Sequence, residues 1–105
     1  IFLEHKTLWA HTGEVDVQAP GVMGQAEVVR EGADLTLVTW SRQRHICAQA
    51  AQTLADQGIE VELIDLKSLW PWDKATVLQS CRKTQRLLVA HEAAQAGGFD
   101  RQCLF

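Results

Sequence analysis

The sequence has no apolar run long enough to cross a membrane and no cluster of Lys and Arg typical of a nucleic-acid surface. Its apolar runs fall far short of the ~18–20 residues that a bilayer helix requires. Ten Lys and Arg stand against 13 Asp and Glu, which gives a net charge of −3. Nucleic-acid binding usually needs a basic patch. We therefore expect neither a membrane nor a nucleic acid as partner.

Cysteine is scarce, and its spacing excludes several kinds of site. The three cysteines, Cys47, Cys81 and Cys103, form no C-x-x-C pair for zinc or redox chemistry. Cys47 and Cys81 lie on the apolar faces of predicted helices, where a free Cys behaves as a small hydrophobic residue. This usage is typical of a reducing compartment.

The start of the sequence lacks the marks of a native N-terminus or a signal peptide. Ile1 takes the place of Met, and no basic segment precedes an apolar stretch. A chain of 105 residues can form one small domain. We interpret it as part of a longer protein, with residues 1–5 as a buried strand. Residues 6–23 lack periodicity and contain turn-forming Gly and Pro, so we expect a linker there.

From residue 24 the pattern predicts an open, mostly parallel α/β sheet with flanking helices. Strands are expected at 25–30, 35–40, 59–66 and 86–92, the first as an antiparallel edge joined to the second by a tight turn. Ser41 and Asp73 are predicted N-caps of two helices, and Gly58 ends the first. The predicted inner faces of the helices are Ile46, Cys47, Ala50, Ala51 and Leu54, and then Val77, Leu78 and Cys81.

Ligands of open α/β sheets bind beyond the carboxyl ends of the strands. The segments expected at that edge are 40–42, 65–72 and 91–98. His91 and Glu92 form the only acid–base pair there, so both are candidate catalytic residues. The structural alternative is that neighbouring strand residues point to opposite faces and do not cooperate.

Other candidates at this edge are aromatic residues and glycines. Trp70, Trp72 and Phe99 are candidate interface residues, although Trp70 and Trp72 could instead cover the core. Gly97-Gly98 could cradle a phosphate, but the G-x-G-x-x-G spacing is absent and a turn is favoured. His5, His11 and His45 lack metal-ligand spacing, and the sequence has no P-loop or Gly-x-Ser-x-Gly motif.

An ordered set of segments resembles the β subunits of the E1 component of pyruvate, branched-chain 2-oxo acid and acetoin dehydrogenases. The set covers nearly the whole chain. It consists of FLEHK (2–6), GQAEVVREG (24–32), DLTLVTW (34–40), GIEVELIDLKSL (58–69), PWD (71–73), KT (83–84), RLLV (86–89), HEA (91–93) and GGF (97–99).

The resemblance implies a division into three parts. Residues 1–6 would be the last strand of a pyrimidine-binding domain, 7–23 an inter-domain linker and 24–105 an incomplete transketolase-like C-terminal domain. Such subunits form heterotetramers of two α and two β subunits, which decarboxylate a 2-oxo acid oxidatively and acylate the lipoyl group of an E2 acyltransferase. The expected compartment is the bacterial cytoplasm or the mitochondrial matrix.

The resemblance also implies that the chemistry lies elsewhere. Thiamine diphosphate and Mg²⁺ would be held between the α subunit and the β pyrimidine-binding domain, and the activating glutamate precedes Ile1. This segment would supply subunit assembly and E2 docking, so we expect the isolated fragment to bind no cofactor or metal and to be inactive. Alternatives are a non-catalytic α/β interaction module and a fragment of transketolase or deoxyxylulose-phosphate synthase.

The chain departs from the family pattern at two places. Asp100 to Phe105 replace the usual small-residue helix start, so we expect the closing strand and helices to be missing and an apolar sheet edge to be exposed. Gln85 stands where the family commonly has glycine, which puts the tight approach to the following strand in question.

Overall fold

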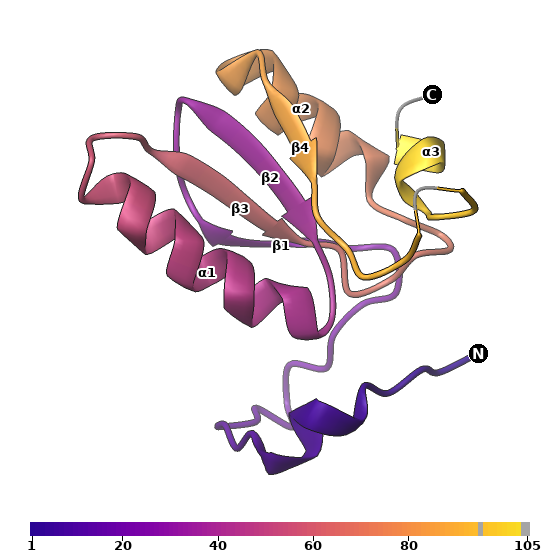
Figure 1. Cartoon of the computed structure of the whole chain (residues 1–105). Helices are drawn as coiled ribbons and strands as arrows, with labels where there is room; N and C mark the ends of the chain where they lie inside the picture. Colours follow the sequence, from indigo (N-terminus) through magenta and orange to yellow (C-terminus); the bar gives the residue numbers. More distant parts are fainter. Residues whose placement is uncertain (95, 104–105) are drawn as a thin grey trace.

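The computed structural model describes residues 1–94 and 96–103, with side chains up to residue 101. Figure 1 shows a small sheet with one long helix in front, a second helix behind, and an N-terminal segment set apart below. The elements in chain order are η1 (Lys6–Ala10), β1 (Glu27–Arg30), β2 (Leu35–Thr39), α1 (Arg42–Ala55), β3 (Val61–Asp65), α2 (Lys74–Thr84), β4 (Leu87–Val89) and α3 (Asp100–Cys103).

The sheet has the order β1-β3-β2-β4 and confirms the predicted mixed α/β class. β2 runs parallel to both β3 and β4, whereas β1 is an antiparallel edge strand. The tight turn suggested that β1 pairs with β2, and this was wrong, because β1 pairs with β3. β2 lies between β3 and β4, and this central position buries Thr36 to Thr39. Pairing with the edge strand β1 would not bury these residues to the same extent.

Gly32 allows the chain to cross from β1 to β2 over the start of β3. The amides of Ala33 and Asp34 both donate to the carbonyl of Glu60, at 3.1 and 2.9 Å. A Cβ at position 32 would overlap the backbone of Val61. The crossing therefore depends on glycine at this position.

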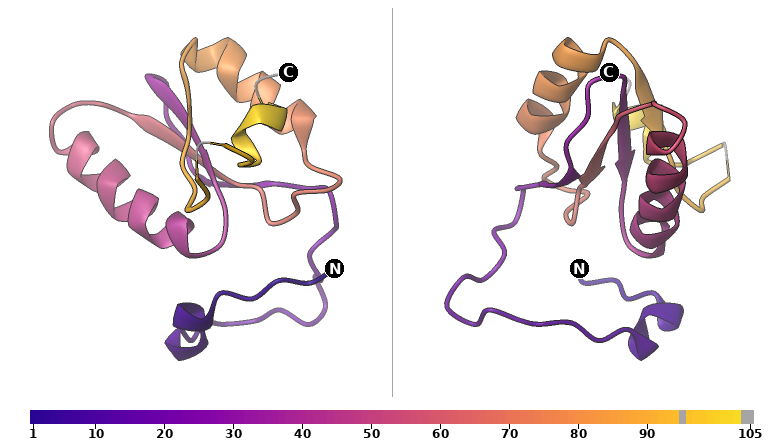
Figure 2. Two further views of the ribbon diagram at one scale, coloured as in Figure 1. Left: turned by 45° about the vertical axis from the view of Figure 1, so that its right-hand side comes forward. Right: turned by 90° about the vertical axis from the view of Figure 1, so that its left-hand side faces the viewer.

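The two helices cover opposite faces of the sheet, so the domain has three layers (Figure 2). One core cluster lies beneath α1, and the other lies beneath α2. The fully or nearly fully buried apolar residues are Leu37, Cys47, Ala51, Val61 and Leu63 in the first cluster, and Val38, Ile64, Leu66 and Val77 in the second.

The predicted helix faces were right in part. Cys47, Ala51 and Val77 are buried as expected. Ile46 and Leu78, however, are 44% and 43% exposed. Each helix packs on only the central strands, so the inward stripe is narrower than the periodicity suggested, and apolar residues at its flank face solvent.

Of the three residues predicted to cap or end a helix, two do so as expected and one does not. Asp73 caps α2 by accepting a hydrogen bond from the amide of Thr76 at 3.1 Å. Ser41 precedes α1 but makes no side-chain capping bond, because its backbone has φ 56° and ψ −136°. Gly58 has a positive φ of 83° after the end of α1, as predicted.

The N-terminal segment contains no strand. Residues 1–4 are exposed, and the 3₁₀-helix η1 follows them. A strand requires a hydrogen-bonding partner, and the four-stranded sheet offers residues 1–5 none, since β1 to β4 pair among themselves. The assignment of residues 1–6 to a preceding domain and of 7–23 to a linker stays a prediction.

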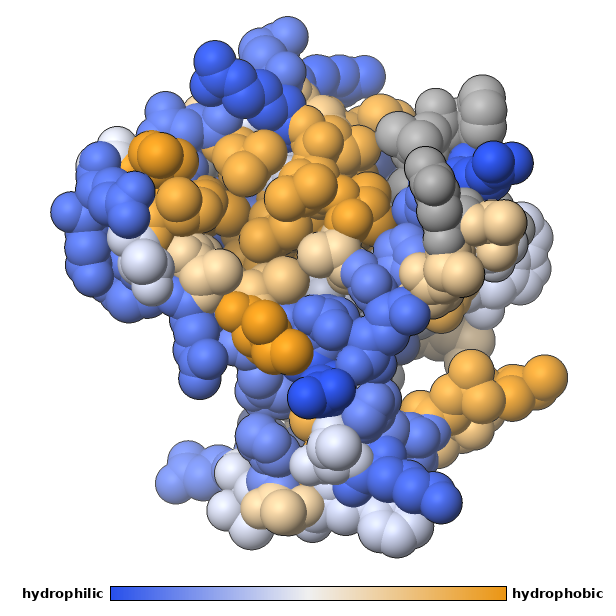
Figure 3. All heavy atoms as spheres, in the orientation of Figure 1, coloured by the Kyte–Doolittle hydropathy of each residue, from blue (hydrophilic) through white to orange (hydrophobic). Residues whose placement is uncertain are grey.

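An apolar area is visible on the face that carries α1 and β4 (Figure 3). Exposed apolar residues of these two elements are Ile46 and Leu88, the latter 51% exposed. β4 is hydrogen-bonded to β2 on one side and forms the edge of the sheet on the other. An apolar edge of this kind was expected. None of the helices that the structure describes is long and apolar enough to cross a membrane.

Candidate functional site

The carboxyl ends of β2, β3 and β4 meet at one edge of the sheet, as parallel pairing requires. The segments that follow these strands begin at Trp40, Leu66 and Ala90. This carboxyl edge holds all five residues that the sequence singled out: His91, Glu92, Trp70, Trp72 and Phe99.

His91 is engaged in packing. Its side chain is 9% exposed, and its ring stacks on Trp40 with centroids 5.2 Å apart and an interplanar angle of 11°. Nε2 lies 3.1 Å from Oδ1 of Asp100 in α3. Nδ1 accepts a hydrogen bond from the amide of Ala93 at 3.1 Å. Nδ1 thus has a hydrogen-bonding partner within the domain, whereas Oδ1 of Asp100 lies beside Nε2 but is buried without a hydrogen bond.

Glu92 points away from His91 and pairs with other groups. One carboxylate oxygen lies 3.0 Å from Nη1 of Arg42 at the start of α1, and the other lies 3.0 Å from Nε2 of His5. The structure therefore does not bring His91 and Glu92 together, in line with the structural alternative. A catalytic role for either stays a prediction.

The glycine pair serves close packing. Gly97 has a φ of 91°, which L-residues rarely adopt. A Cβ at Gly98 would come within 2.6 Å of Cε1 of His91. The preferred interpretation of Gly97-Gly98 as a turn agrees with this geometry, because the pair lets the chain pass against the His91 ring.

The three aromatic candidates occupy two different environments. Trp70 precedes a cis peptide bond to Pro71 and is 80% exposed. Trp72 and Phe99 are half-buried and pack edge to face, with centroids 6.3 Å apart, against the core beneath α2. Only Trp70 thus presents its side chain freely to a partner, whereas Trp72 and Phe99 mainly complete the core.

A charged network at the same edge was missed by the sequence-based reasoning. Asp65 ends β3 and is buried, and its Oδ2 lies 3.1 Å from Nε of Arg44. Burial raises the pKa of the Asp65 carboxyl, although the Lys67 amide and the Arg44 charge act in the opposite direction. Lys67 also pairs with Glu27 at 2.6 Å, and that hydrogen bond lowers the pKa of Glu27. The signal was an acid, Asp65, at the end of a strand whose neighbouring residues Leu63, Ile64 and Leu66 are apolar.

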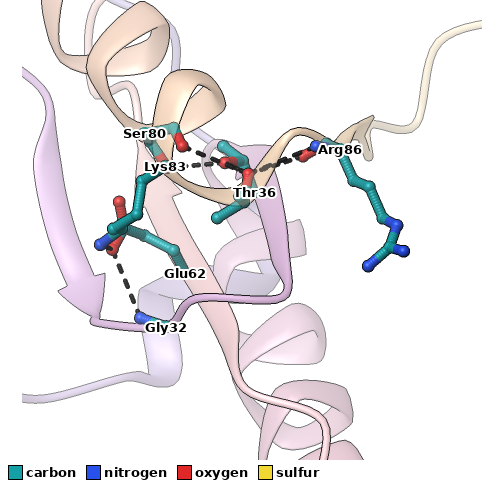
Figure 4. A network of polar contacts seen from close by, with 7 residues as sticks. Gly32, Thr36, Glu62, Ser80, Lys83 and Arg86 are labelled. Carbon is teal, nitrogen blue, oxygen red and sulfur yellow. Dashed lines mark hydrogen bonds and ion pairs between the residues drawn. The ribbon is translucent and has the colours of Figure 1, made fainter.

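A polar network lies at the opposite, amino-terminal edge of the strands (Figure 4). Glu62 in β3 is buried and pairs with Lys83 near the end of α2. Burial alone would raise the pKa of Glu62, but hydrogen bonds from Lys83, Ser80 and the Gly32 amide outweigh it, so the pKa is lowered. Thr36 in β2 lies 2.6 Å from the hydroxyls of both Ser80 and Thr84.

This amino-terminal network borders a pocket of about 290 Å³. Its lining carries two carboxylates, Glu31 and Glu62, and one amine, Lys83. Because Glu62 already has three hydrogen-bonding partners, the pocket offers no unpaired buried charge to a ligand. We interpret the network as a tie between α2 and the sheet.

Across residues 1–94 and 96–103, no three His, Cys, Asp or Glu side chains gather in a way that could hold a metal ion. Burial raises the pKa of the free thiols Cys47 and Cys81, which makes them poor nucleophiles. The side chain of Cys103 lies outside the described part of the chain.

Comparison with known proteins gives one family match and several close relatives. The family model described as transketolase, C-terminal domain, matches residues 24–104. The chain is 49% identical over 102 residues to 2-oxoisovalerate dehydrogenase subunit beta 2, mitochondrial, of Arabidopsis thaliana, covering 94% of this chain and 28% of that protein. It is 45% identical to the β subunit of acetoin:2,6-dichlorophenolindophenol oxidoreductase of Cupriavidus necator, covering 90% and 28%.

A third relative and a solved structure agree with these matches. The pyruvate dehydrogenase E1 component subunit beta of Chlorokybus atmophyticus is 42% identical, over 93% of this chain and 30% of that protein. A split-gene transketolase, solved as an inactive β4 tetramer, superposes with a TM-score of 0.78 at 27% identity, over 85% of this chain and 29% of that chain.

The chain thus spans less than a third of the length of these three relatives. The resemblance to E1 β subunits that the ordered segments indicated is confirmed. With the matched family model covering residues 24–104 and the fold shared with transketolase, the chain belongs to the transketolase C-terminal domain family.

Proposed function

We propose that this chain is part of the β subunit of a thiamine-diphosphate-dependent 2-oxo acid dehydrogenase. The observation that carries the proposal is the identity of 42–49% to three such β subunits, each over at least 90% of this chain. The holoenzyme would decarboxylate a 2-oxo acid oxidatively and pass the acyl group to the lipoyl group of E2. Enzymes named for 2-oxoisovalerate, acetoin and pyruvate are all represented among the relatives, so the substrate stays open.

Within that enzyme this segment would act in assembly and docking. The contacts at the carboxyl edge support this proposal. His91, Glu92 and Asp65 all contact other side chains of this chain, so none of them is free to act as an acid or base on a substrate. Thiamine diphosphate and Mg²⁺ would be bound by other parts of the enzyme. The partners would be the E1 α subunit, a second β subunit and E2. Three relatives carry the word mitochondrial in their names, so the compartment would be the mitochondrial matrix or, for a bacterial protein, the cytoplasm.

Trp70 is the best candidate for the contact residue. Its large apolar side chain is exposed on a loop, and Trp is enriched among residues that dominate binding at interfaces. Trp70→Ala should weaken binding of this chain to an E1 α subunit or to the subunit-binding region of E2 by at least ~2 kcal/mol, about 30-fold in Kd. Calorimetric titration with each purified partner measures this loss.

Trp9→Ala is the matched control, because Trp9 is also exposed but lies in η1, outside the domain. The control should bind as the unaltered chain does, and both variants should keep the melting temperature. Equal binding by Trp70→Ala and the unaltered chain would remove Trp70 from the interface. Failure of the unaltered chain to bind either partner would count against the docking role itself.

The structural likeness to a split-gene transketolase supports a second candidate, a subunit of a transketolase-type enzyme. The lower identity of 27% makes this candidate weaker than the dehydrogenase. A chain that binds a transketolase partner subunit but no dehydrogenase α subunit would favour it.

A further inference from the structure

The chain diverges after β2 and β3, and this divergence marks one point on the carboxyl edge. β2 leads into α1 and β3 leads toward α2, and these two helices cover opposite faces of the sheet (Figure 2). Because β2 and β3 are neighbouring parallel strands, this is the place where an open α/β sheet usually binds a ligand. We call it the switch point.

Four charged side chains of this chain meet at the switch point. Oδ2 of Asp65 lies 3.1 Å from Nε of Arg44, and Nζ of Lys67 lies 2.6 Å from the carboxylate of Glu27. Nη2 of Arg44 also lies 3.7 Å from Glu27. Two acids and two cations thus pair with one another, so a charged small molecule would have to break these pairs. Their arrangement fits a task within the chain better than ligand binding.

The other oxygen of Asp65 holds the first turn after β3. Oδ1 accepts a hydrogen bond from the amide of Lys67 at 3.2 Å. Lys67 has a φ of 55°, and the amide of Ser68 donates to the carbonyl of Leu66, which closes a γ-turn around Lys67. A γ-turn with positive φ is rare and strained, and it persists only where its surroundings hold it. Asp65 is 7% exposed and is itself fixed by Arg44, so it is a firm acceptor for this amide.

The turn directs the chain into residues 66–72, which we call the Trp70 loop. The hydroxyl of Ser68 donates to the carbonyl of Pro71, so the loop closes on itself around Trp70. At the far end, Asp73 caps α2 and also accepts a hydrogen bond from the backbone amide that precedes β1. Trp70 is 80% exposed, but the loop that carries it is fixed at both ends by carboxylates.

We propose that Asp65 is a positioning residue, which fixes the Trp70 loop so that Trp70 meets its partner in a ready conformation. This inference rests on the proposed function for the identity of the partner, E1 α or E2, but not for the order of the loop. A loop that is ordered before binding loses less conformational entropy when the complex forms. Asp65 therefore acts on affinity through the loop and touches no partner.

The order of the loop can be measured by ¹⁵N relaxation of the Lys67 and Trp70 amides. In the unaltered chain both order parameters should be about 0.85, and in Asp65→Ala they should fall below about 0.6. Glu62→Ala is the matched control, because Glu62 is a second buried acid of β3 whose bonds lie at the amino-terminal edge. The control should leave both values unchanged. Unchanged order in Asp65→Ala, or an equal fall in both variants, would overturn the proposal.

Two substitutions of Lys67 repeat the test at an exposed position, which keeps it decisive even where Asp65→Ala does not fold. Lys67→Val and Lys67→Asn both remove the ammonium group that pairs with Glu27, but only the β-branched side chain resists a positive φ. Lys67→Val should lower the order at Trp70 and weaken partner binding about fivefold, whereas Lys67→Asn should match the unaltered chain within about twofold.

The Lys67 pair also separates this inference from the proposed function. Equal order in the two variants, or equal binding to a partner that the unaltered chain binds, would contradict the positioning role. Absence of binding by the unaltered chain to either partner would count against the proposed function instead, and the order parameters would then decide the role of Asp65.

Discussion

Three residues other than glycine in the described part of the chain adopt positive φ angles, and two of them border helices. Gln85 ends α2 with φ 58° and ψ 13°, the left-handed conformation that glycine usually takes at this position. The sequence comparison with the family had marked Gln85 as an unusual replacement of glycine. The structure shows that Gln85 keeps the conformation that glycine would have, so the approach to β4 is maintained.

Ser41 is under greater conformational strain than Gln85. Its φ of 56° and ψ of −136° lie in a region that L-residues seldom enter, and its hydroxyl caps nothing. We expect Ser41→Gly to stabilise the chain by about 1 kcal/mol, because glycine relieves the strain and no hydrogen bond is lost. Urea unfolding followed by circular dichroism measures the change. Ser41→Ala is the control and should give no gain, whereas equal gains from both substitutions would show that strain is not the cause.

At the residue scale, the sequence predicted which side chains would be at the carboxyl edge but not what each would touch. His91 and Glu92 were correctly predicted to lie at the carboxyl edge, because the carboxyl ends of parallel strands meet at the same edge of a sheet. Their partners, Asp100, Arg42 and His5, come from other elements and depend on the three-dimensional arrangement. Periodicity carries no information about such long-range pairs.

At the element scale, α2 is attached to the sheet by polar groups as much as by apolar packing. Its inward positions include Ser80 and Thr84, which bond to Thr36, and its last turn supplies Lys83 to Glu62. The predicted apolar stripe of Val77, Leu78 and Cys81 missed both hydroxyl residues. A Ser or Thr in a helix is usually exposed, so the helix sequence alone does not indicate that Ser80 and Thr84 face inward. The one clue in the sequence was Thr36, a polar residue in a strand that was expected to be buried.

The Glu62–Lys83 pair should make stability depend on pH. The pKa of Glu62 is lower in the folded chain than the ordinary 4.5. A lowered folded-state pKa means that the stabilisation is present above the unfolded pKa and is lost as pH falls through the folded one. Glu62→Gln should therefore cost about 1–3 kcal/mol at pH 7, and the difference from the unaltered chain should shrink below about pH 4.5.

Urea unfolding of both chains from pH 3 to pH 7 provides the measurement. Glu60→Gln is the control, since Glu60 pairs with Arg30 at the surface and should contribute less than about 1 kcal/mol. A difference for Glu62→Gln that stays constant across this range would mean that the carboxylate charge is not the source of its stabilisation.

The order of the strands was the main element-scale error. A short connection between neighbouring strands usually forms a hairpin, which favoured β1 beside β2. The actual order inserts β3 between them, and Gly32 makes this possible by letting the connection cross closely over the start of β3. The apolar character of both β2 and β3 was the available clue, because two buried parallel strands tend to lie side by side at the centre.

At the scale of the whole molecule, the domain resembles a scaffold with one exposed aromatic residue and one apolar edge. Trp70 and Leu88 lie in different parts of the chain, in the loop before α2 and in β4. The family relationship extends over residues 24–104, whereas the N-terminal segment contacts the domain through His5 and His11. These features agree with the proposed role in assembly and docking.

If the proposed function holds, this domain can serve as the corresponding part of an E1 β subunit. The most direct test is a chimera in which residues 24–103 of this chain replace the matching residues of the Cupriavidus necator acetoin β subunit. We expect the chimera to form a complex with the α subunit and to keep oxidoreductase activity within about tenfold, as assembly by a related scaffold would allow. A folded chimera that stays unassembled in sedimentation, while the parent β subunit assembles, would contradict it.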